Sequence, residues 1–168
     1  MQFSIKPPSK DDLIENIVGY KGKIYFGVPE DTSSMRSEWL DNRHISKIKV
    51  NNPSPDNAYI LATMEHGSPV KNIPPRPLLK PVIRKHREQI QNIFERIYKL
   101  LLEGDEIGAD FEMERLSQRI KRWTQEFFVE DNGWAPNSPA TIKRKGSDKP
   151  LIDTSSLRQS IRGIFVKK

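Results

Sequence analysis

Two long stretches of the chain repeat apolar residues at the spacing of an amphipathic helix. The first runs from just after Pro81 to about Gly104, and the second follows the segment GDEIGAD, residues 104–110. Within each stretch the apolar positions recur every three or four residues, which places them on one helix face. They are Ile83, Ile90, Phe94, Ile97 and Leu101 in the first, and Met113, Leu116, Ile120, Trp123 and Phe127 in the second. The pattern predicts two long helices whose stripes pack into a core.

Shorter stretches have the pattern of β-strands. Residues 23–28 (KIYFGV) are rich in β-branched and aromatic residues, and residues 45–50 (ISKIKV) alternate apolar and basic side chains as a half-exposed strand does. Residues 58–67 (AYILATMEHG) predict a more buried strand that ends at a glycine. The last residues, 161–168 (IRGIFVKK), leave room for a single strand.

A proline-rich segment separates the strand region from the helices. Residues 68–81 (SPVKNIPPRPLLKP) include Pro74, Pro75, Pro77 and Pro81, which forbid continuous helix and favour an extended backbone. We expect the part from Ile73 to Leu79 to project and to pack on a neighbouring subunit. Alternatively, the segment crosses from strand to helix over its own sheet.

These elements predict an α+β fold. The expected architecture is a small antiparallel or mixed sheet packed by two long helices, with a short N-terminal helix capped by Ser9 and the extended proline-rich arm. At 168 residues the chain is long enough for one moderate core, so we expect a single domain, residues 1–168, with the arm 68–81 within it.

The region after the second helix reads as a series of turns and caps. Asn132-Gly133 is a turn signal, Ser138-Pro139 suits the start of a helix, and Gly146 its end. We expect Trp134 to fill an apolar gap.

The sequence LIDTS, residues 151–155, invites comparison with the aspartic-protease signature. Such enzymes need further strands after the aspartate, whereas Leu157 and Ile161 here stand four apart as in a helix. We therefore expect Asp153 or Thr154 to cap a short helix, with Ser156 and Gln159 available for a capping box.

Composition excludes several classes of function. The chain has no cysteine and only three histidines, so it cannot hold a disulfide or a cysteine-based zinc site. Nucleotide-binding glycine loops, the zinc-protease helix motif and the G-x-S-x-G elbow are all missing from the sequence. No apolar run approaches the ~20 residues of a membrane span, and the start has no signal-peptide core, which favours cytoplasmic synthesis. We expect no enzymatic activity, no cofactor and no metal.

The order of motifs from Tyr59 to Ile161 resembles the virion-morphogenesis and tail-completion proteins of tailed bacteriophages, including the Mu type and the minor tail protein Z type. In that family a Glu-Gly end precedes an "IPPRPF"-like arm, and a "W-x-P-x-x-x-x-T-x-x-x-K" turn leads to "PLIDTG-x-L-x-x-S". The matching residues are Glu65, Gly67, Ile73, Pro74, Arg76, Pro77, Trp134, Pro136, Thr141, Lys145, Pro150, Leu151, Asp153, Thr154, Leu157 and Ser160. Ser155 stands where the family usually has Gly, and Leu78 where Phe is common.

The resemblance implies a non-enzymatic virion protein that is assembled in the bacterial cytoplasm. It would form a homo-oligomeric ring, a hexamer or a dodecamer, that contacts the head–tail connector and the tail terminator or tube proteins, with DNA able to pass through the lumen. The candidate interface residues are Ile73, Pro74, Pro75, Arg76, Pro77 and Leu78. The candidate structural motif comprises Trp134, Pro136, Thr141, Lys145, Asp153, Thr154 and Leu157. For Arg76 we weigh an anchor on carboxylates or carbonyls of a neighbour against an intrachain salt bridge.

A second hypothesis is a basic protein that binds nucleic acid. The net charge is +6, and the densest basic pieces are IKRKG (142–146) and QRIKRW (118–123). Both pieces are interrupted by apolar residues, and 22 acidic residues moderate the charge.

Overall fold

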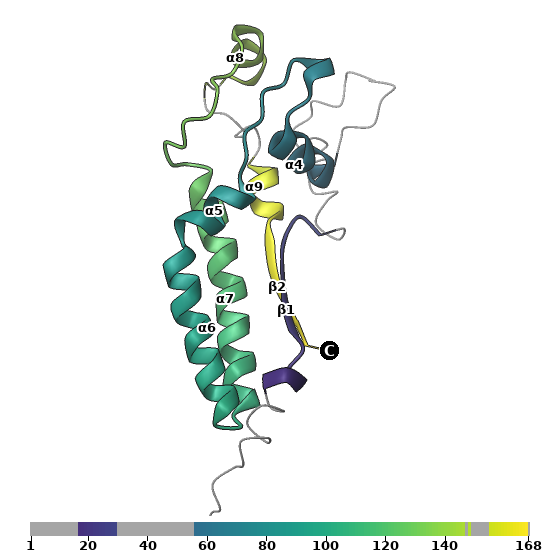
Figure 1. Ribbon diagram of the computed structural model, residues 1–168. Helices are drawn as coiled ribbons and strands as arrows, with labels where there is room; N and C mark the ends of the chain where they lie inside the picture. Colours follow the sequence, from purple (N-terminus) through teal and green to yellow (C-terminus); the bar gives the residue numbers. More distant parts are fainter. Residues whose placement is uncertain (1–16, 30–55, 147, 149–154, 168) are drawn as a thin grey trace, which may run out of the picture.

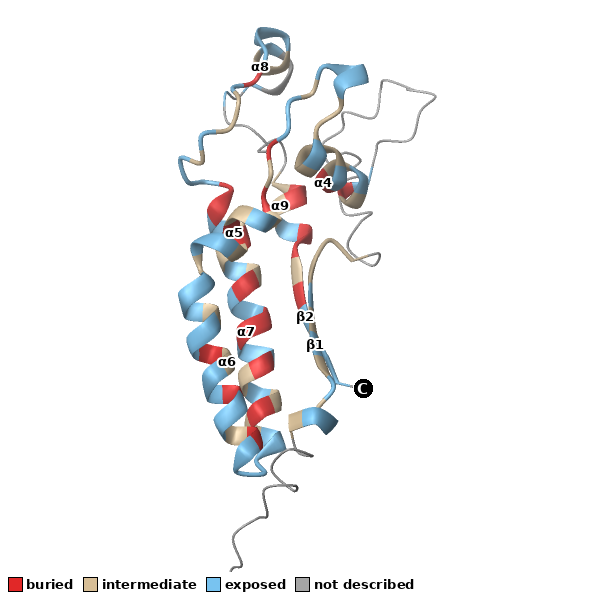
Figure 2. Ribbon diagram, viewed as in Figure 1, coloured by how far each residue is buried: buried red, intermediate tan, exposed pale blue. Residues whose placement is uncertain are grey.

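Two antiparallel helices form the spine of the protein in the computed structural model, which describes residues 17–29, 56–146, 148 and 155–167. They are α6 (Arg87–Leu102) and α7 (Glu106–Phe127), joined by a tight turn at Gly104 with φ 78°. Asp105 caps α7 by accepting a hydrogen bond from the Gly108 N–H at 2.8 Å. The apolar stripes face one another: Ile93, Ile97 and Leu101 of α6 are buried with Ala109, Met113, Leu116 and Ile120 of α7 (Figure 2). Both predicted long helices are confirmed.

The first helix differs from its prediction at its beginning. A separate helix α5 (Leu79–Lys85) precedes α6, and the chain bends between them at His86, whose φ is −103° and ψ is 17°. The His86 ring stacks on Trp123 of α7 with ring centroids 4.0 Å apart. Pro81 lies in the first turn of α5, where its missing N–H leaves no intrahelical bond unmade.

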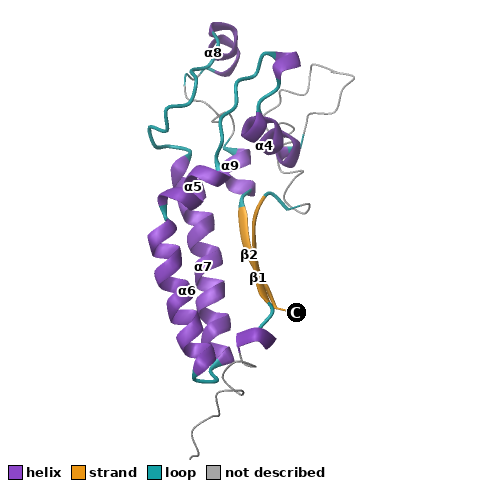
Figure 3. Ribbon diagram, viewed as in Figure 1, coloured by secondary structure: helices purple, strands orange, loops and turns teal. Residues whose placement is uncertain are grey.

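A two-stranded antiparallel sheet lies along α7 (Figure 3). Strand β1 (Gly22–Gly27) pairs with β2 (Arg162–Lys167), so that segments near opposite ends of the sequence lie side by side. Side chains alternate across the sheet: Ile24, Phe26 and Phe165 pack on the helical core, and their neighbours face away from it. The strands predicted at residues 23–28 and at the C-terminus are confirmed, as is the α+β class.

The strand predicted for residues 58–67 is wrong, because this stretch is helix α4 (Asn57–His66). Asp56 supplies the N-cap, since its side chain accepts a hydrogen bond from the Tyr59 N–H at 2.7 Å. Only Asn57 and Leu61, one turn apart, are buried. The run Tyr59-Ile60-Leu61 is continuously apolar, and such a run hides the helical period.

The remaining described elements gather at the end of the molecule away from the α6–α7 turn (Figure 1). They are the short 3₁₀ helix η1 (Pro69–Lys71), α8 (Pro139–Lys145) and, at the head of β2, α9 (Ser156–Ser160). The caps predicted for α8 are confirmed: Ser138 accepts from the Thr141 N–H, and Gly146 ends the helix with φ 69°. The strand predicted at 45–50 lies outside the described residues, and so does the N-terminal helix except residues 17–19, which are helical.

Candidate functional site

The proline-rich segment lies within its own chain and does not project. Residues 74–78 form neither helix nor strand, Leu78 has helical backbone angles (φ −118°, ψ −50°), and Pro74 and Pro75 are exposed. Arg76, however, is only 7% exposed, and Leu78 is fully buried against Val82, Phe127 and Phe128. The expectation that these two side chains reach out to a neighbour is therefore wrong, and the crossing within the chain is the observed arrangement.

Arg76 ties three separate parts of the sequence together. Its Nε and Nη2 donate to the Ala135 carbonyl at 3.0 and 2.8 Å, and Nη2 also donates to the Pro136 carbonyl at 3.1 Å. Its backbone N–H donates to the Met64 carbonyl at 2.7 Å. Burial lowers the pKa of the guanidinium, which nonetheless stays charged because it starts from so high a value. The partners are carbonyls, so the salt bridge weighed for Arg76 is not what the structure shows.

Glu65 holds the other side of the same segment. Its Oε2 accepts from the Leu78 and Leu79 N–H groups at 2.7 and 3.2 Å. These amides begin α5, whose N-cap residue provides no side-chain acceptor, so a carboxylate from α4 replaces the missing cap. Sequence reasoning gave Glu65 no such role, because the acceptor and the amides it caps stand 13 and 14 residues apart.

Trp134 covers the segment from outside. Its Nε1 donates to the Pro77 carbonyl at 3.1 Å, and its ring meets Phe127 and Phe128 edge-on, with centroids 5.8 and 6.4 Å away. The side chain fills an apolar gap, as predicted, but it is half-buried.

The C-terminal helix α9 closes this assembly, which we call the Arg76 junction: Glu65, residues 76–78, residues 134–136, and α9. Leu157 and Ile161 are buried in the same apolar cluster as Leu78. The Asn57 side-chain amide donates to the Ser156 hydroxyl at 3.0 Å, which links α4 to α9. Several of the matching motif residues thus meet at one place, although they are far apart along the chain: Glu65, Arg76, Pro77, Trp134, Pro136 and Leu157.

Some of the predicted motif residues lie elsewhere. Pro136 contributes its carbonyl to Arg76, whereas Thr141 takes part in the start of α8, where its hydroxyl is 2.9 Å from that of Ser138. Asp153, Thr154 and the side chain of Lys145 lie outside the described residues. Helix α9 has Ser155 at its N-cap position and Ser156 as its first helical residue, and the cap predicted from Asp153 or Thr154 falls outside the described residues.

Ser155 adopts the left-handed conformation that glycine takes most easily, with φ 62° and ψ 2°. A left-handed conformation costs an L-residue about 1–2 kcal/mol, and glycine avoids the steric part of that cost. We expect Ser155→Gly to raise the free energy of unfolding by about 1 kcal/mol in denaturant titration. The matched control is Asn72→Gly, at φ 49°, where the gain should be smaller because asparagine tolerates this conformation. Equal gains, or a loss at Ser155, would contradict the prediction.

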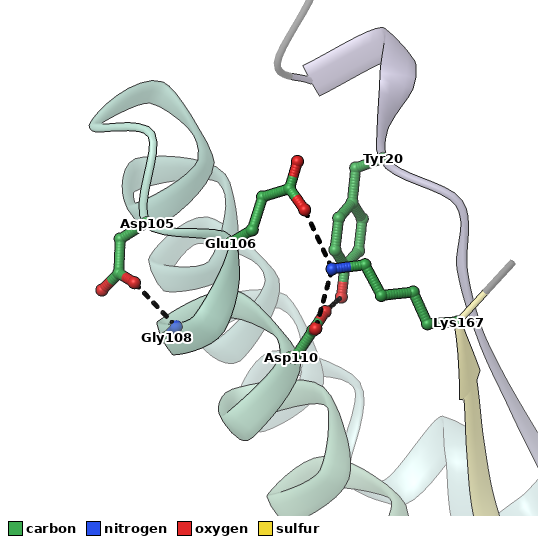
Figure 4. Close-up of polar contacts among 6 residues, drawn as sticks. All are labelled: Tyr20, Asp105, Glu106, Gly108, Asp110 and Lys167. Carbon is green, nitrogen blue, oxygen red and sulfur yellow. Dashed lines mark hydrogen bonds and ion pairs between the residues drawn. The ribbon is translucent and has the colours of Figure 1, made fainter.

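A polar cluster fastens the sheet to α7 near the α6–α7 turn (Figure 4). The Tyr20 hydroxyl donates to Asp110 at 2.8 Å. Lys167, at the end of β2, donates to Asp110 at 2.8 Å and to Glu106 at 2.9 Å, and its ammonium lies 5.5 Å from the centre of the Tyr20 ring. Both ends of the described chain are thereby fixed to one helix.

The polar cluster around Asp110 predicts that the free energy of unfolding falls at alkaline pH. Burial, then the hydrogen bond and charge of Asp110, raise the pKa of Tyr20 above its ordinary value of 10.0. The folded chain therefore keeps the phenol proton to higher pH than the unfolded chain, and this contribution is complete below about pH 10 and declines above it. Hydrogen bonds to Asp110 and Glu106 also raise the pKa of Lys167, which acts in the same direction.

We expect the stability gap between wild type and Tyr20→Phe, measured by denaturant unfolding, to narrow as the pH rises from about 8 to about 11. Tyr98→Phe, at an exposed tyrosine of α6, is the control and should follow the wild type. A gap that stays constant with pH would contradict the assignment.

The chemistry at the junction is that of backbone fixation. The charged groups of Arg76 and Glu65 form hydrogen bonds with backbone carbonyls and amides of their own chain. Across the described residues, no group of three or more His, Asp or Glu side chains is placed to hold a metal ion, and no helix is long and apolar enough to cross a membrane. Comparison of the chain with protein families, with curated proteins and with solved structures finds no match.

Proposed function

We propose that the protein is a structural component of the neck or tail of a tailed bacteriophage particle, a ring-forming head–tail adaptor or tail completion protein. The proposal comes from the resemblance of its motifs. It is supported by one observation: six of the sixteen matching residues, Glu65, Arg76, Pro77, Trp134, Pro136 and Leu157, meet in the Arg76 junction. Motifs that form one physical unit are less easily explained as separate coincidences.

The junction gives these motifs a mechanical role in such a particle. Arg76, Glu65 and Trp134 brace the end of the molecule that carries α4, η1 and α8 against the α6–α7 spine. A subunit of a ring transmits load between neighbours and needs its two ends held in a fixed relation. In this proposal the exposed Pro74 and Pro75, with Ile73, remain candidate contacts to an adjoining protein.

The nucleic-acid hypothesis receives less support from the surface of α7. Within QRIKRW (118–123), Arg122 is paired with Glu126 at 3.2 Å, and about two turns before it Arg115 is paired with Glu112 at 2.8 Å. Phosphate binding depends on cations that release counterions, and a paired arginine contributes little to it.

Light scattering and negative-stain images of the full chain test the proposal. A ring with a central lumen is the expected result. A monomer or dimer that binds DNA, with an affinity that falls steeply as salt rises, would overturn it in favour of the nucleic-acid hypothesis.

A further inference from the structure

The outer face of the β1–β2 sheet carries apolar side chains where water would favour polar ones. In the strand register Tyr25 is opposite Ile164, and Lys23 is opposite Val166, all on the side away from α7. Tyr25, Ile164 and Val166 are 55%, 41% and 40% exposed. A hollow of about 150 Å³ on this face is lined by Tyr25 and Ile164 among others. Antiparallel sheets with one solvated face usually place polar residues there, so this face has the character of a binding surface.

This face is also basic. Lys23 is exposed on this face, the half-buried Arg162 shares it while donating to the Gln159 and Ile161 carbonyls, and residues 17–29 and 155–167 contain no acidic residue. Of the three cations on the two strands, Lys167 alone forms ion pairs among the described residues, with Glu106 and Asp110. We call Lys23, Tyr25, Arg162, Ile164 and Val166 the sheet patch. Its charge favours an apolar partner with acidic residues around it.

A surface of that kind lies at the α6–α7 turn of the same chain. Ile107 and Phe111, one turn apart on α7, are 83% and 63% exposed, and Leu102 at the end of α6 is 39% exposed. Residues 100–114 contain six acidic residues and no lysine or arginine, and Arg115, which lies 5.7 Å from the centre of the Phe111 ring, is paired with Glu112. Among the described residues, Glu103 has no ion-pair partner. We call Leu102, Glu103, Ile107 and Phe111 the tip patch.

The two patches cannot meet within one molecule. The sheet packs its inner face on α7, so the sheet patch faces away from the helix whose first turns carry the tip patch (Figure 1). Contact between them requires a second copy. When two copies meet in this way, the pair still has one unoccupied tip patch and one unoccupied sheet patch. Such heterologous contacts continue until they close into a ring or extend as a filament.

We propose that the tip patch of one copy docks on the sheet patch of the next copy. The inference rests on the proposed ring and identifies the surfaces that would build it. Ile107 and Phe111 supply the apolar contact to Tyr25, Ile164 and Val166, and Glu103 lies toward the basic rim. Apolar burial accounts for the affinity, and the opposite charges select this pairing over tip to tip or sheet to sheet.

Sedimentation of the full chain and of three variants tests the proposal. Ile107→Lys disables the tip patch, and Tyr25→Glu disables the sheet patch. Both side chains are exposed, so circular dichroism should show an unchanged fold. Val129→Lys, at a 53% exposed valine outside both patches, is the matched control. We expect the first two variants to sediment as monomers and the control to form the same ring as the wild type.

Mixing the two disabled variants gives the sharpest readout. One retains a working sheet patch and the other a working tip patch, so an equimolar mixture should form a one-to-one heterodimer and grow no further. Rings that persist in both variants would overturn the inference while leaving the proposed function intact. A wild type that remains monomeric at all concentrations would overturn both. Loss of DNA binding in Tyr25→Glu, with no effect on assembly, would assign the sheet patch to nucleic acid.

Discussion

Replacing Arg76 by alanine is expected to lower the free energy of unfolding by about 3–5 kcal/mol, because it removes charge-assisted bonds worth about 1.5–3 kcal/mol each. Among the described residues, the Arg76 guanidinium donates the hydrogen bonds that the Ala135 and Pro136 carbonyls accept. Arg76 is 7% exposed, so water has little access to replace it. Denaturant titration of the full chain measures the loss, with circular dichroism as the probe.

Arg76→Lys separates the charge from the geometry. Lysine keeps the positive charge but presents a single ammonium in place of the planar fork that reaches two successive carbonyls. We expect a loss between those of wild type and Arg76→Ala. If Arg76→Ala unfolds at the wild-type denaturant concentration yet fails to assemble, Arg76 serves a neighbouring subunit, and the placement of this side chain within its own chain is wrong.

The spine of the fold could be predicted because its signal is local. The apolar residues of α6 and α7 recur with the helical period over several turns, and the caps of α8 are spelled out by Ser138, Pro139 and Gly146. Helix α4 could not be recognised in the same way. Its apolar residues run consecutively, so the decisive signal was the Asp56 cap, which identifies only the first turn.

The Arg76 junction shows where sequence reasoning stops. Arg76 and Trp134 could be singled out from their residue types and their proline-rich surroundings. Their partners could not, because Arg76 binds carbonyls 59 and 60 residues away and Trp134 binds one 57 residues away. Backbone carbonyls have no signature in a sequence, so a buried cation held by them is easily mistaken for one that awaits an external partner.

Gly163→Ala should be as damaging as the loss of Arg76, for a steric reason. A Cβ at this position would lie 2.0 Å from the Ser117 carbonyl oxygen and 2.8 Å from its carbonyl carbon, and both atoms belong to the backbone of α7. Neither strand nor helix can yield without disturbing the packing of Phe165 and Ile120 beside it. We expect a loss of about 3 kcal/mol or more in the free energy of unfolding, at the upper end of overpacking costs. Gly19→Ala is the control, since a Cβ there meets nothing within 4 Å. Because β2 would have to move off α7, the Gly163 variant should also show faster hydrogen exchange at the β1 and β2 amides. Unchanged exchange and stability would mean that the sheet does not lie against α7 as described.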